Sequence, residues 1–113
     1  MSGAQKIMSL IGIAKKAGKV ISGTDMAVES VRSGRKNSVK LLLIACDASK
    51  NTLKRVENTS AYYRIPVITL EADKAELARI TGHSSILSVI GITDTGFVKA
   101  MQETAMKEAN EAK

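Results

Sequence analysis

The stretch Val39-Lys40-Leu41-Leu42-Leu43-Ile44-Ala45-Cys46-Asp47 decides the fold, because it contains the longest apolar run of the chain and ends at a carboxylate. A short apolar run bounded by polar residues is typical of a strand that is buried on both faces of a sheet. The run is far shorter than the roughly 18 apolar residues that a membrane-spanning helix needs. We therefore expect a central strand over Val39 to Ala45 and no association with a membrane.

Helices and short strands alternate on the N-terminal side of this run. Ser2 followed by Gln5 resembles a capping box, and apolar residues then recur at helical spacing. After Gly23, Thr24 or Asp25 can accept hydrogen bonds at the start of a second helix, and Asn37 can adopt the left-handed conformation after its end. The expected elements are a helix from about Ser2 to Gly18, a strand over Lys19 to Ser22, and a helix from Thr24 or Asp25 to about Arg35.

The same alternation continues on the C-terminal side. Asp47 or Ser49 can cap a third helix, and Thr93, Asp94 or Thr95 a last one. The third helix is expected to face inward with Leu53, Val56 and Ser60, and the last with Phe97, Val98, Met101 and Ala105. The remaining elements are a strand over Ile65 to Leu70, a helix opened by Asp73 and closed by Gly82, and a strand over Ile86 to Ile92.

This element order predicts an α/β protein, a three-layer α/β/α sandwich with a four-stranded mixed sheet. The 113 residues, 44% of them hydrophobic, suffice for one core, so we expect a single domain over residues 1–113. The polar tail from about residue 107 is expected to fray. The single cysteine, Cys46, permits neither a disulfide framework nor a cysteine-based zinc site, which favours a cytoplasmic protein.

Positive charge is concentrated in the first half of the chain. Residues 1–56 contain 11 Lys or Arg and 3 acidic residues, which gives a net charge of +8. Residues 57–113 contain 6 Lys or Arg and 8 acidic residues, which gives a net charge of −2. Such asymmetry favours a polyanionic partner, because Lys and Arg displace counterions from phosphates. A basic surface that only maintains solubility is the alternative interpretation.

Aromatic residues are few: Phe97, Tyr62 and Tyr63. Modules that hold single-stranded nucleic acid present several aromatic faces on which bases stack. We therefore expect no stacking platform, and RNA binding by another mode.

The residue patterns give little support to catalysis. Phosphate-binding glycine motifs are missing, and His83 is the only histidine, which fits a surface loop better than a catalytic triad. Asp47 follows a central strand, as a phosphoacceptor aspartate does, but lacks the neighbouring acidic pair that binds the metal. Glu71, Asp73 and Glu76 are explained by the preference of acidic residues for a helix start. We expect no enzyme, no cofactor and no metal site.

Several segments, in order, resemble one family over about residues 7 to 101. They are Ile11 to Lys19, Gly23-Thr24-Asp25, Leu42 to Ser49, Ile65-Pro66-Val67, Leu77 to Gly82 and Asp94 to Phe97. The chain is similar to the kink-turn-binding ribosomal protein superfamily, and within it to the bacterial YlxQ-type ribosomal-protein-like group. The resemblance implies a non-catalytic protein that binds structured RNA, such as ribosomal RNA, with the ribosome as a candidate partner.

The family's RNA surface combines the start of the helix after the first strand with the loop before the last strand. Here the resemblance places it at Gly23 to Glu29 and Gly82 to Leu87, and nearby cations are expected to surround it. The candidate RNA-binding residues are Lys15, Lys16, Lys19, Gly23, Thr24, Asp25, Arg32, Arg35, Lys36, Ser84, Ser85 and Ile86.

The sequence departs from the family's kink-turn motif at three positions. The family has Gly-x-Asn-Glu with Lys three residues later, whereas this chain has Asp25, Met26 and Glu29. A carboxylate only accepts hydrogen bonds and repels phosphate, whereas an amide also donates. These changes favour electrostatic RNA affinity over kink-turn selectivity.

Two other functions remain open. Some relatives of the superfamily act as protein-interaction adaptors, which would bind no RNA in a salt-sensitive way. A phosphotransfer or small-ligand protein that uses Asp47 is the third possibility, because a fold alone does not fix function. We expect the protein to bind RNA as a monomer.

Overall fold

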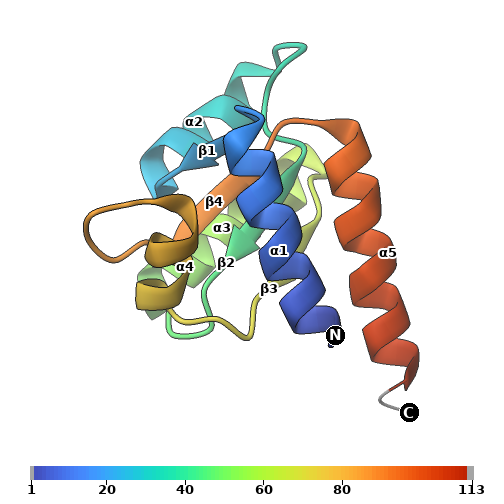
Figure 1. Cartoon of the computed structure of the whole chain (residues 1–113). Coiled ribbons are helices and arrows are strands. Elements are labelled where there is room, and N and C mark those ends of the chain that lie inside the picture. Colours follow the sequence, from blue (N-terminus) through green and yellow to red (C-terminus); the bar gives the residue numbers. More distant parts are fainter. Residues whose placement is uncertain (1, 112–113) are drawn as a thin grey trace.

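A computed structural model describes the backbone of residues 2–111 and the side chains of residues 2–108. In this part of the chain, five helices surround a four-stranded sheet (Figure 1). The elements are α1 (Gly3–Lys16), β1 (Val20–Ser22), α2 (Thr24–Ser33), β2 (Leu41–Ile44), α3 (Lys50–Tyr63), β3 (Val67–Thr69), α4 (Lys74–Thr81), β4 (Val89–Ile92) and α5 (Thr95–Glu111). The predicted alternation of helices and strands is confirmed.

The sheet is mixed, with the strand order β1-β4-β2-β3. β4 is antiparallel to both of its neighbours, whereas β2 and β3 are parallel. The two central strands are buried along their whole length, as the apolar run around Leu41 to Ile44 predicts.

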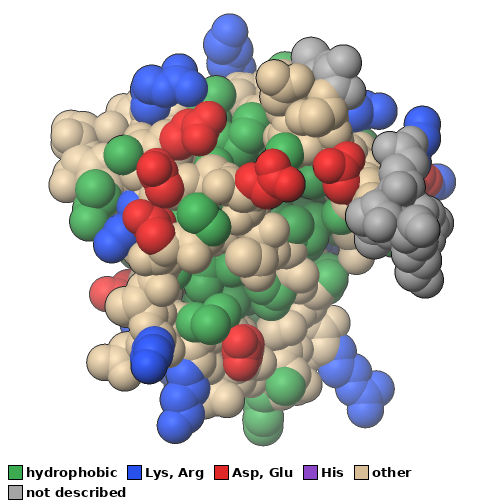
Figure 2. Space-filling model, turned by 90° about the horizontal axis from the view of Figure 1, so that it is seen from below, with side chains coloured by type: hydrophobic (Ala, Val, Ile, Leu, Met, Phe, Trp, Pro, Cys, Tyr) green, Lys and Arg blue, Asp and Glu red, His purple; other side chains and the backbone are tan. Residues whose placement is uncertain are grey.

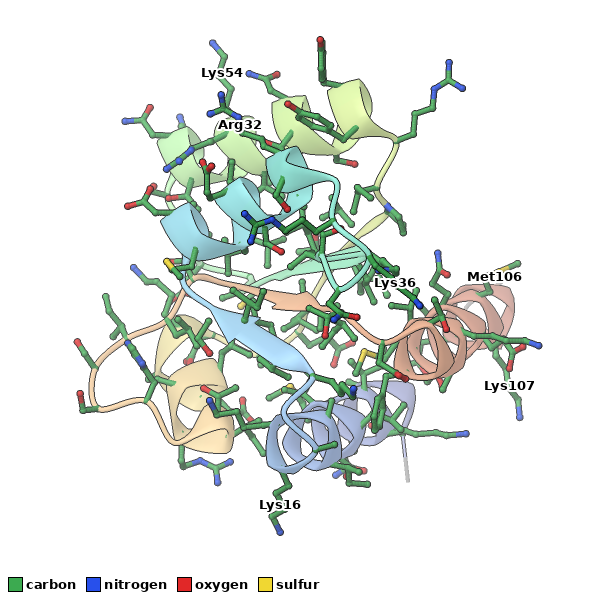
Figure 3. All side chains as sticks on the ribbon, turned by 90° about the horizontal axis from the view of Figure 1, so that it is seen from above. Lys16, Arg32, Lys36, Lys54, Met106 and Lys107 are labelled. Atoms are coloured by element: carbon green, nitrogen blue, oxygen red, sulfur yellow. The ribbon has the colours of Figure 1, made fainter. Side chains whose placement is uncertain are left out.

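Two helical layers cover the two faces of the sheet, which confirms the three-layer sandwich (Figure 3). Successive strand residues point to opposite faces, so β2 contributes to two separate hydrophobic clusters. Leu41 and Leu43 pack with residues of α1, α4 and α5, whereas Leu42 and Ile44 pack with residues of α2 and α3.

A glycine in β4 allows close packing against the segment that precedes β2. A Cβ atom at Gly91 would lie 2.4 Å and 2.7 Å from the two Cγ atoms of Val39. Both residues are buried. Val39 therefore occupies the space that a larger residue at position 91 would need.

Several predicted helix ends are confirmed. Ser2 and Gln5 form a capping box, Ser49 caps α3, Asp73 caps α4, and Gly82 ends α4 in the left-handed conformation. Asp94 accepts a hydrogen bond from the Phe97 N–H at the start of α5. Where the sequence left Asp47 or Ser49 open, Ser49 is the cap. Asp47 instead accepts a hydrogen bond from the Lys74 N–H at 2.9 Å.

Four local predictions were wrong. The residue before α2 is Gly23, and neither Thr24 nor Asp25 caps that helix with its side chain. The helix ends at Ser33, because Gly34 takes the left-handed conformation that was assigned to Asn37. Leu53 lies on the exposed side of α3, and the buried residues of this helix are Val56, as predicted, and Thr59 rather than Ser60. The last strand begins at Val89, so Ile86 belongs to the preceding loop.

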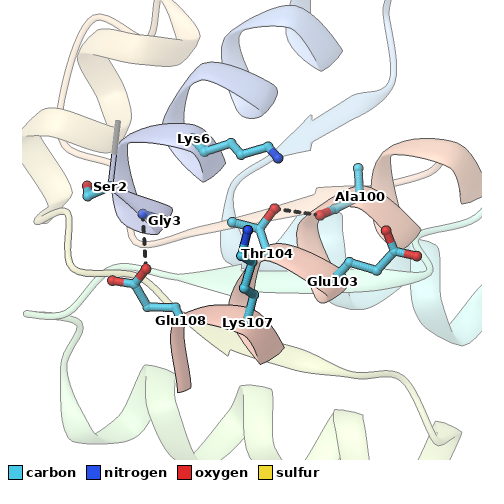
Figure 4. A pocket seen from close by; sticks show the side chains of 8 residues that line it. All are labelled: Ser2, Gly3, Lys6, Ala100, Glu103, Thr104, Lys107 and Glu108. Atoms are coloured by element: carbon cyan, nitrogen blue, oxygen red, sulfur yellow. Dashed lines mark hydrogen bonds between the residues drawn. The ribbon is translucent and has the colours of Figure 1, made fainter. Parts of the chain in front are cut away.

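The two terminal helices pack side by side (Figure 1). The Glu108 carboxylate of α5 accepts a hydrogen bond from the Gly3 N–H of α1 at 3.0 Å (Figure 4). Helix α5 continues through Glu111, and fraying of the tail stays a prediction. No helix within residues 2–111 combines the length and apolarity needed to cross a membrane.

Candidate nucleic-acid interface

The turn from β1 into α2 is built on Gly23. Its φ of 101° and ψ of 144° lie in a region that is open to glycine and strained for other residues. The Gly23 N–H donates to the Val89 carbonyl at the start of β4, at 2.9 Å. This bond fixes the start of α2 beside the segment that leads into β4.

The first turn of α2 lacks a side-chain cap. The first backbone hydrogen bond of the helix runs from the Ala27 N–H to the Gly23 carbonyl. The N–H groups of Thr24, Asp25 and Met26 therefore have no hydrogen-bond acceptor within residues 2–111. Free N–H groups and the helix dipole make such an end favourable for an anion, including a phosphate.

The loop at 83–88 lies next to this helix start. Ser88 accepts a hydrogen bond from Ala45, and the following residue, Val89, is the partner of Gly23. The side chains of Ser84, Ser85 and Ile86 are exposed, and Ile86 is 59% accessible. The hydrogen bond from Gly23 to Val89 thus places the C-terminal end of the loop that contains Ser84 to Ile86 beside the segment Gly23 to Asp25.

Asp25, in the first turn of α2, forms an ion pair with Arg55 of α3. Both side chains are accessible to solvent, 87% for Asp25 and 47% for Arg55. The pair places a guanidinium at the side of the helix start and partly neutralises the carboxylate. Arg55 was not among the predicted site residues.

The other predicted cations do not surround this helix start. Lys19 precedes β1, and its carbonyl accepts from the Thr93 N–H after β4. Gly23 follows β1 and bonds to Val89 at the other end of this strand pair. About four strand residues, or roughly 13 Å, therefore separate the Lys19 end of β1 from its Gly23 end. The Lys19 end is the upper end in Figure 1. It also contains the end of α1, with Lys15 and Lys16, and the turn before β2, with Arg35 and Lys36.

A shallow groove beside α2 connects the two ends. Its volume is about 610 Å³, and it extends from Met26 in the first turn to Arg35 and Lys36 after the last. Glu29 lies on its wall between them. An extended polyanion in this groove would meet positive charge at one end and the uncapped helix start at the other.

Arg32 belongs to a different surface. It lines a hollow between α2 and α3, together with Lys54 and Arg55 of α3 (Figure 3). Helical spacing places Lys54, Arg55, Asn58 and Tyr62 on one face of α3, so the sequence contained a signal for this surface.

Acidic residues gather elsewhere, around an apolar strip on the face shown in Figure 2. Glu71 and Glu108 line a hollow of about 270 Å³ with apolar residues of α1 and β3, and Glu76 lines the adjoining one. This face does not attract a polyanion.

A further hollow lies between α1 and α5. Lys6 and Lys107 line it together with Glu103 and Glu108, and Thr104 donates to the Ala100 carbonyl of its own helix (Figure 4). Within residues 2–111, no three His, Cys, Asp or Glu side chains gather as metal ligands would.

Comparison with known proteins identifies the family of the chain. The sequence profile of the Ribosomal protein L7Ae/L30e/S12e/Gadd45 family matches residues 5–102. The chain belongs to this family. The predicted resemblance to the ribosomal protein superfamily and its YlxQ-type group is therefore confirmed.

Among the relatives in this family are bacterial and archaeal proteins. "RNA-binding protein YlxQ" from Enterococcus faecium is 38% identical, with 88% of this chain and 90% of the relative covered. "RNA-binding protein YlxQ" from Bacillus subtilis (strain 168) is 37% identical, with coverage of 81% and 87%. "Large ribosomal subunit protein eL30" from Methanosphaera stadtmanae is 31% identical, with coverage of 76% and 85%.

Solved structures share the architecture. A protein of unknown function from Bacillus halodurans superposes with a TM-score of 0.79 and is 29% identical over 88% of this chain and 95% of that chain. The "15.5kD RNA binding protein" of Giardia lamblia has a TM-score of 0.77 at 17% identity, covering 96% and 88%, which shows the common fold.

Proposed function

We propose that this chain is a non-catalytic, ribosomal-protein-like protein that binds structured RNA. The observation that carries the proposal is the uncapped start of α2, held beside the loop at 83–88 by the hydrogen bond from Gly23 to Val89. Membership of the L7Ae/L30e family and the RNA-binding names of its relatives support it.

The proposed mode of binding uses the backbone first. The N–H groups of Thr24, Asp25 and Met26 donate to one phosphate, and Gly23 presents no side chain that would keep the RNA backbone away. Ser84 and Ser85 are exposed in the neighbouring loop at 83–88, and their hydroxyl groups can donate and accept hydrogen bonds. Such contacts position an RNA without reading its bases.

Long-range attraction comes from the opposite end of the sheet. Lys15, Lys16 and Lys19 with Arg35 and Lys36 concentrate positive charge there, and the groove along α2 leads from Arg35 towards Met26. The bound RNA extends along this groove, so that phosphate contacts at both ends contribute to affinity and to its salt dependence.

Selectivity for kink-turns is weak in this proposal. Asp25 is engaged by Arg55, Met26 has no hydrogen-bonding group, and Glu29 adds negative charge to the groove. Each changed base contact removes about 1–3 kcal/mol of discrimination in nucleic-acid sites generally. Ribosomal RNA in the cytoplasm, bound by a monomer and in the context of the ribosome, is the partner that this mode fits.

A titration of the purified protein against a kink-turn RNA and a matched straight duplex, at two salt concentrations, tests the proposal. We expect salt-sensitive binding to both, with a small preference for the kink-turn. The triple substitution Asp25→Asn, Met26→Glu and Glu29→Lys should increase that preference.

A control variant separates charge from position in this test. The triple substitution raises the net charge by 2, as does Glu103→Lys on the exposed side of α5. An equal change of preference in both variants would contradict the proposed position of the RNA. Absence of binding to either RNA would contradict the function and favour the protein-interaction adaptor.

A further inference from the structure

A second surface with the chemistry of a nucleic-acid site lies between α2 and α3, on the side of this helical layer that faces away from the sheet (Figure 3). The hollow has a volume of about 700 Å³ and is open to solvent. Its walls are formed by residues of α2 and α3, among them Arg32, Asn51, Lys54, Asn58 and Tyr62.

The charge of this hollow is positive. Arg32 extends from α2, and Lys54 and Arg55 from α3, whereas no carboxylate lines it. In the part of the chain that the structure describes, Arg55 pairs with Asp25 at the edge, and Arg32 and Lys54 form no ion pair. Two cations are therefore available to phosphates.

The hollow also contains an exposed aromatic pair. The Tyr62 side chain is 80% accessible and Tyr63 is 37% accessible, so these rings contribute little to the core. Their centroids are 4.8 Å apart with an interplanar angle of 68°, an edge-to-face arrangement. The sequence predicted no stacking platform, but the high exposure of Tyr62 leaves its ring available for a base.

Amide groups complete the set of contacts. Asn51 and Asn58 lie two helical turns apart on the same face of α3 as Lys54 and Tyr62. An amide both donates and accepts hydrogen bonds, as a base edge requires, and its neutrality adds no repulsion. Cations, an exposed ring and amides on one face are the groups that hold single-stranded nucleic acid.

We propose that the α2–α3 hollow binds unpaired nucleotides of the RNA, with a base stacked on Tyr62 and phosphates contacted by Arg32 and Lys54. The proposal rests on the RNA-binding function and adds a single-stranded segment to the structured RNA bound at the start of α2. The Asp25–Arg55 pair lies at the boundary between the two surfaces, so one RNA can reach both.

A pair of RNAs tests this inference: a hairpin with an internal loop, and the same hairpin with an extension of about six uridines, a length within the range of single-strand sites. The wild-type protein should bind the extended RNA more tightly. Tyr62→Ala should remove about five- to a hundred-fold of this gain, whereas Tyr62→Phe should retain most of it.

The cations are tested through the salt dependence of the same gain. Arg32→Ala with Lys54→Ala should lower the slope of log affinity against log salt by about 0.7 for each cation removed. Lys99→Ala with Lys107→Ala, on exposed positions of α5, changes the net charge equally and should leave the gain intact.

Crosslinking supplies a readout that does not depend on affinity. Ultraviolet irradiation with the extended RNA should attach uridine to the tryptic peptide of residues 56–64, which contains both tyrosines. Binding of the hairpin without any gain from the extension, or a gain unchanged in Tyr62→Ala, would overturn the inference and leave the proposed function intact. Binding of neither RNA would overturn both.

Discussion

Arg55 of α3 forms an ion pair with Asp25 in the first turn of α2, across 30 positions of sequence. The carboxylate that stands nearest the uncapped helix start is therefore partly neutralised by a neighbouring helix. The pair joins the two surfaces that we assign to RNA, and its charge balance sets how strongly a phosphate is attracted there.

Substitution Asp25→Asn should raise affinity for structured RNA. It removes a negative charge from the helix start and frees Arg55 for a phosphate. The free energy of unfolding should fall by less than about 1 kcal/mol, because exposed ion pairs contribute little. Titration at two salt concentrations measures the effect. Glu57→Gln, an equal charge change on α3, should raise affinity less, and equal gains would contradict a specific role for Asp25.

Replacing Lys15, Lys16 and Lys19 together with Ala should weaken RNA binding for all RNAs and flatten its salt dependence. Each lost phosphate contact lowers the slope of log affinity against log salt by about 0.9 on a duplex. All three side chains are exposed, so stability should change little. Fluorescence anisotropy over a salt series measures the slope. A slope equal to that of the wild type would show that RNA does not reach the end of α1.

Gly91→Ala should destabilise the protein by about 1–3 kcal/mol, because the new methyl group would overlap the side chain of Val39. Urea denaturation measures the free energy of unfolding. Gly12→Ala is the control: its Cβ meets no atom within 4 Å, so it should stabilise α1 by about 0.5–1 kcal/mol. Val39→Ala removes the methyl groups that the new Cβ would overlap, so adding it to Gly91→Ala should restore part of the lost stability. A double variant whose loss of stability equals the sum of the two single losses would contradict the steric cause.

Gly23→Ala should destabilise the protein by about 1–3 kcal/mol, although the space around the new Cβ is empty. The reason is the backbone, whose φ of 101° other residues rarely adopt. RNA binding should decrease as well, since Gly23 sets the direction of the α2 start. Gly34→Asn is the matched control, because its φ of 63° is a left-handed conformation that asparagine tolerates. Equal losses in both variants would contradict this distinction.

Local chemistry explains which parts of the fold were predictable. The apolar run around Leu41 to Ile44 identified the central strand, and Ser2, Ser49 and Asp73 identified helix starts through their hydrogen-bonding side chains. Gly23 was misread because a polar residue next to a glycine normally acts as the cap. Here Gly23 itself occupies the N-cap position, and because glycine has no side chain, the start of α2 has no side-chain cap.

The arrangement of the site depended on long-range pairing, which periodicity does not reveal. The positions of Lys19 and Gly23 at opposite ends of β1 follow from their hydrogen bonds to Thr93, just after β4, and to Val89, its first residue, about 70 positions away. Sequence proximity therefore grouped these cations with a helix start from which the length of β1 separates them. Arg55 was missed for the same reason, since its partner Asp25 lies on another helix.

The strand order β1-β4-β2-β3 constrains how the chain folds during its synthesis. β4 separates β1 from β2, and it is the last strand to leave the ribosome. Until it has emerged, β1 has no neighbour in the sheet, so only the parallel pair of β2 and β3 can form early. Most of the sheet therefore assembles after residues 89–92 have been translated, and a nascent chain halted before them should remain sensitive to protease.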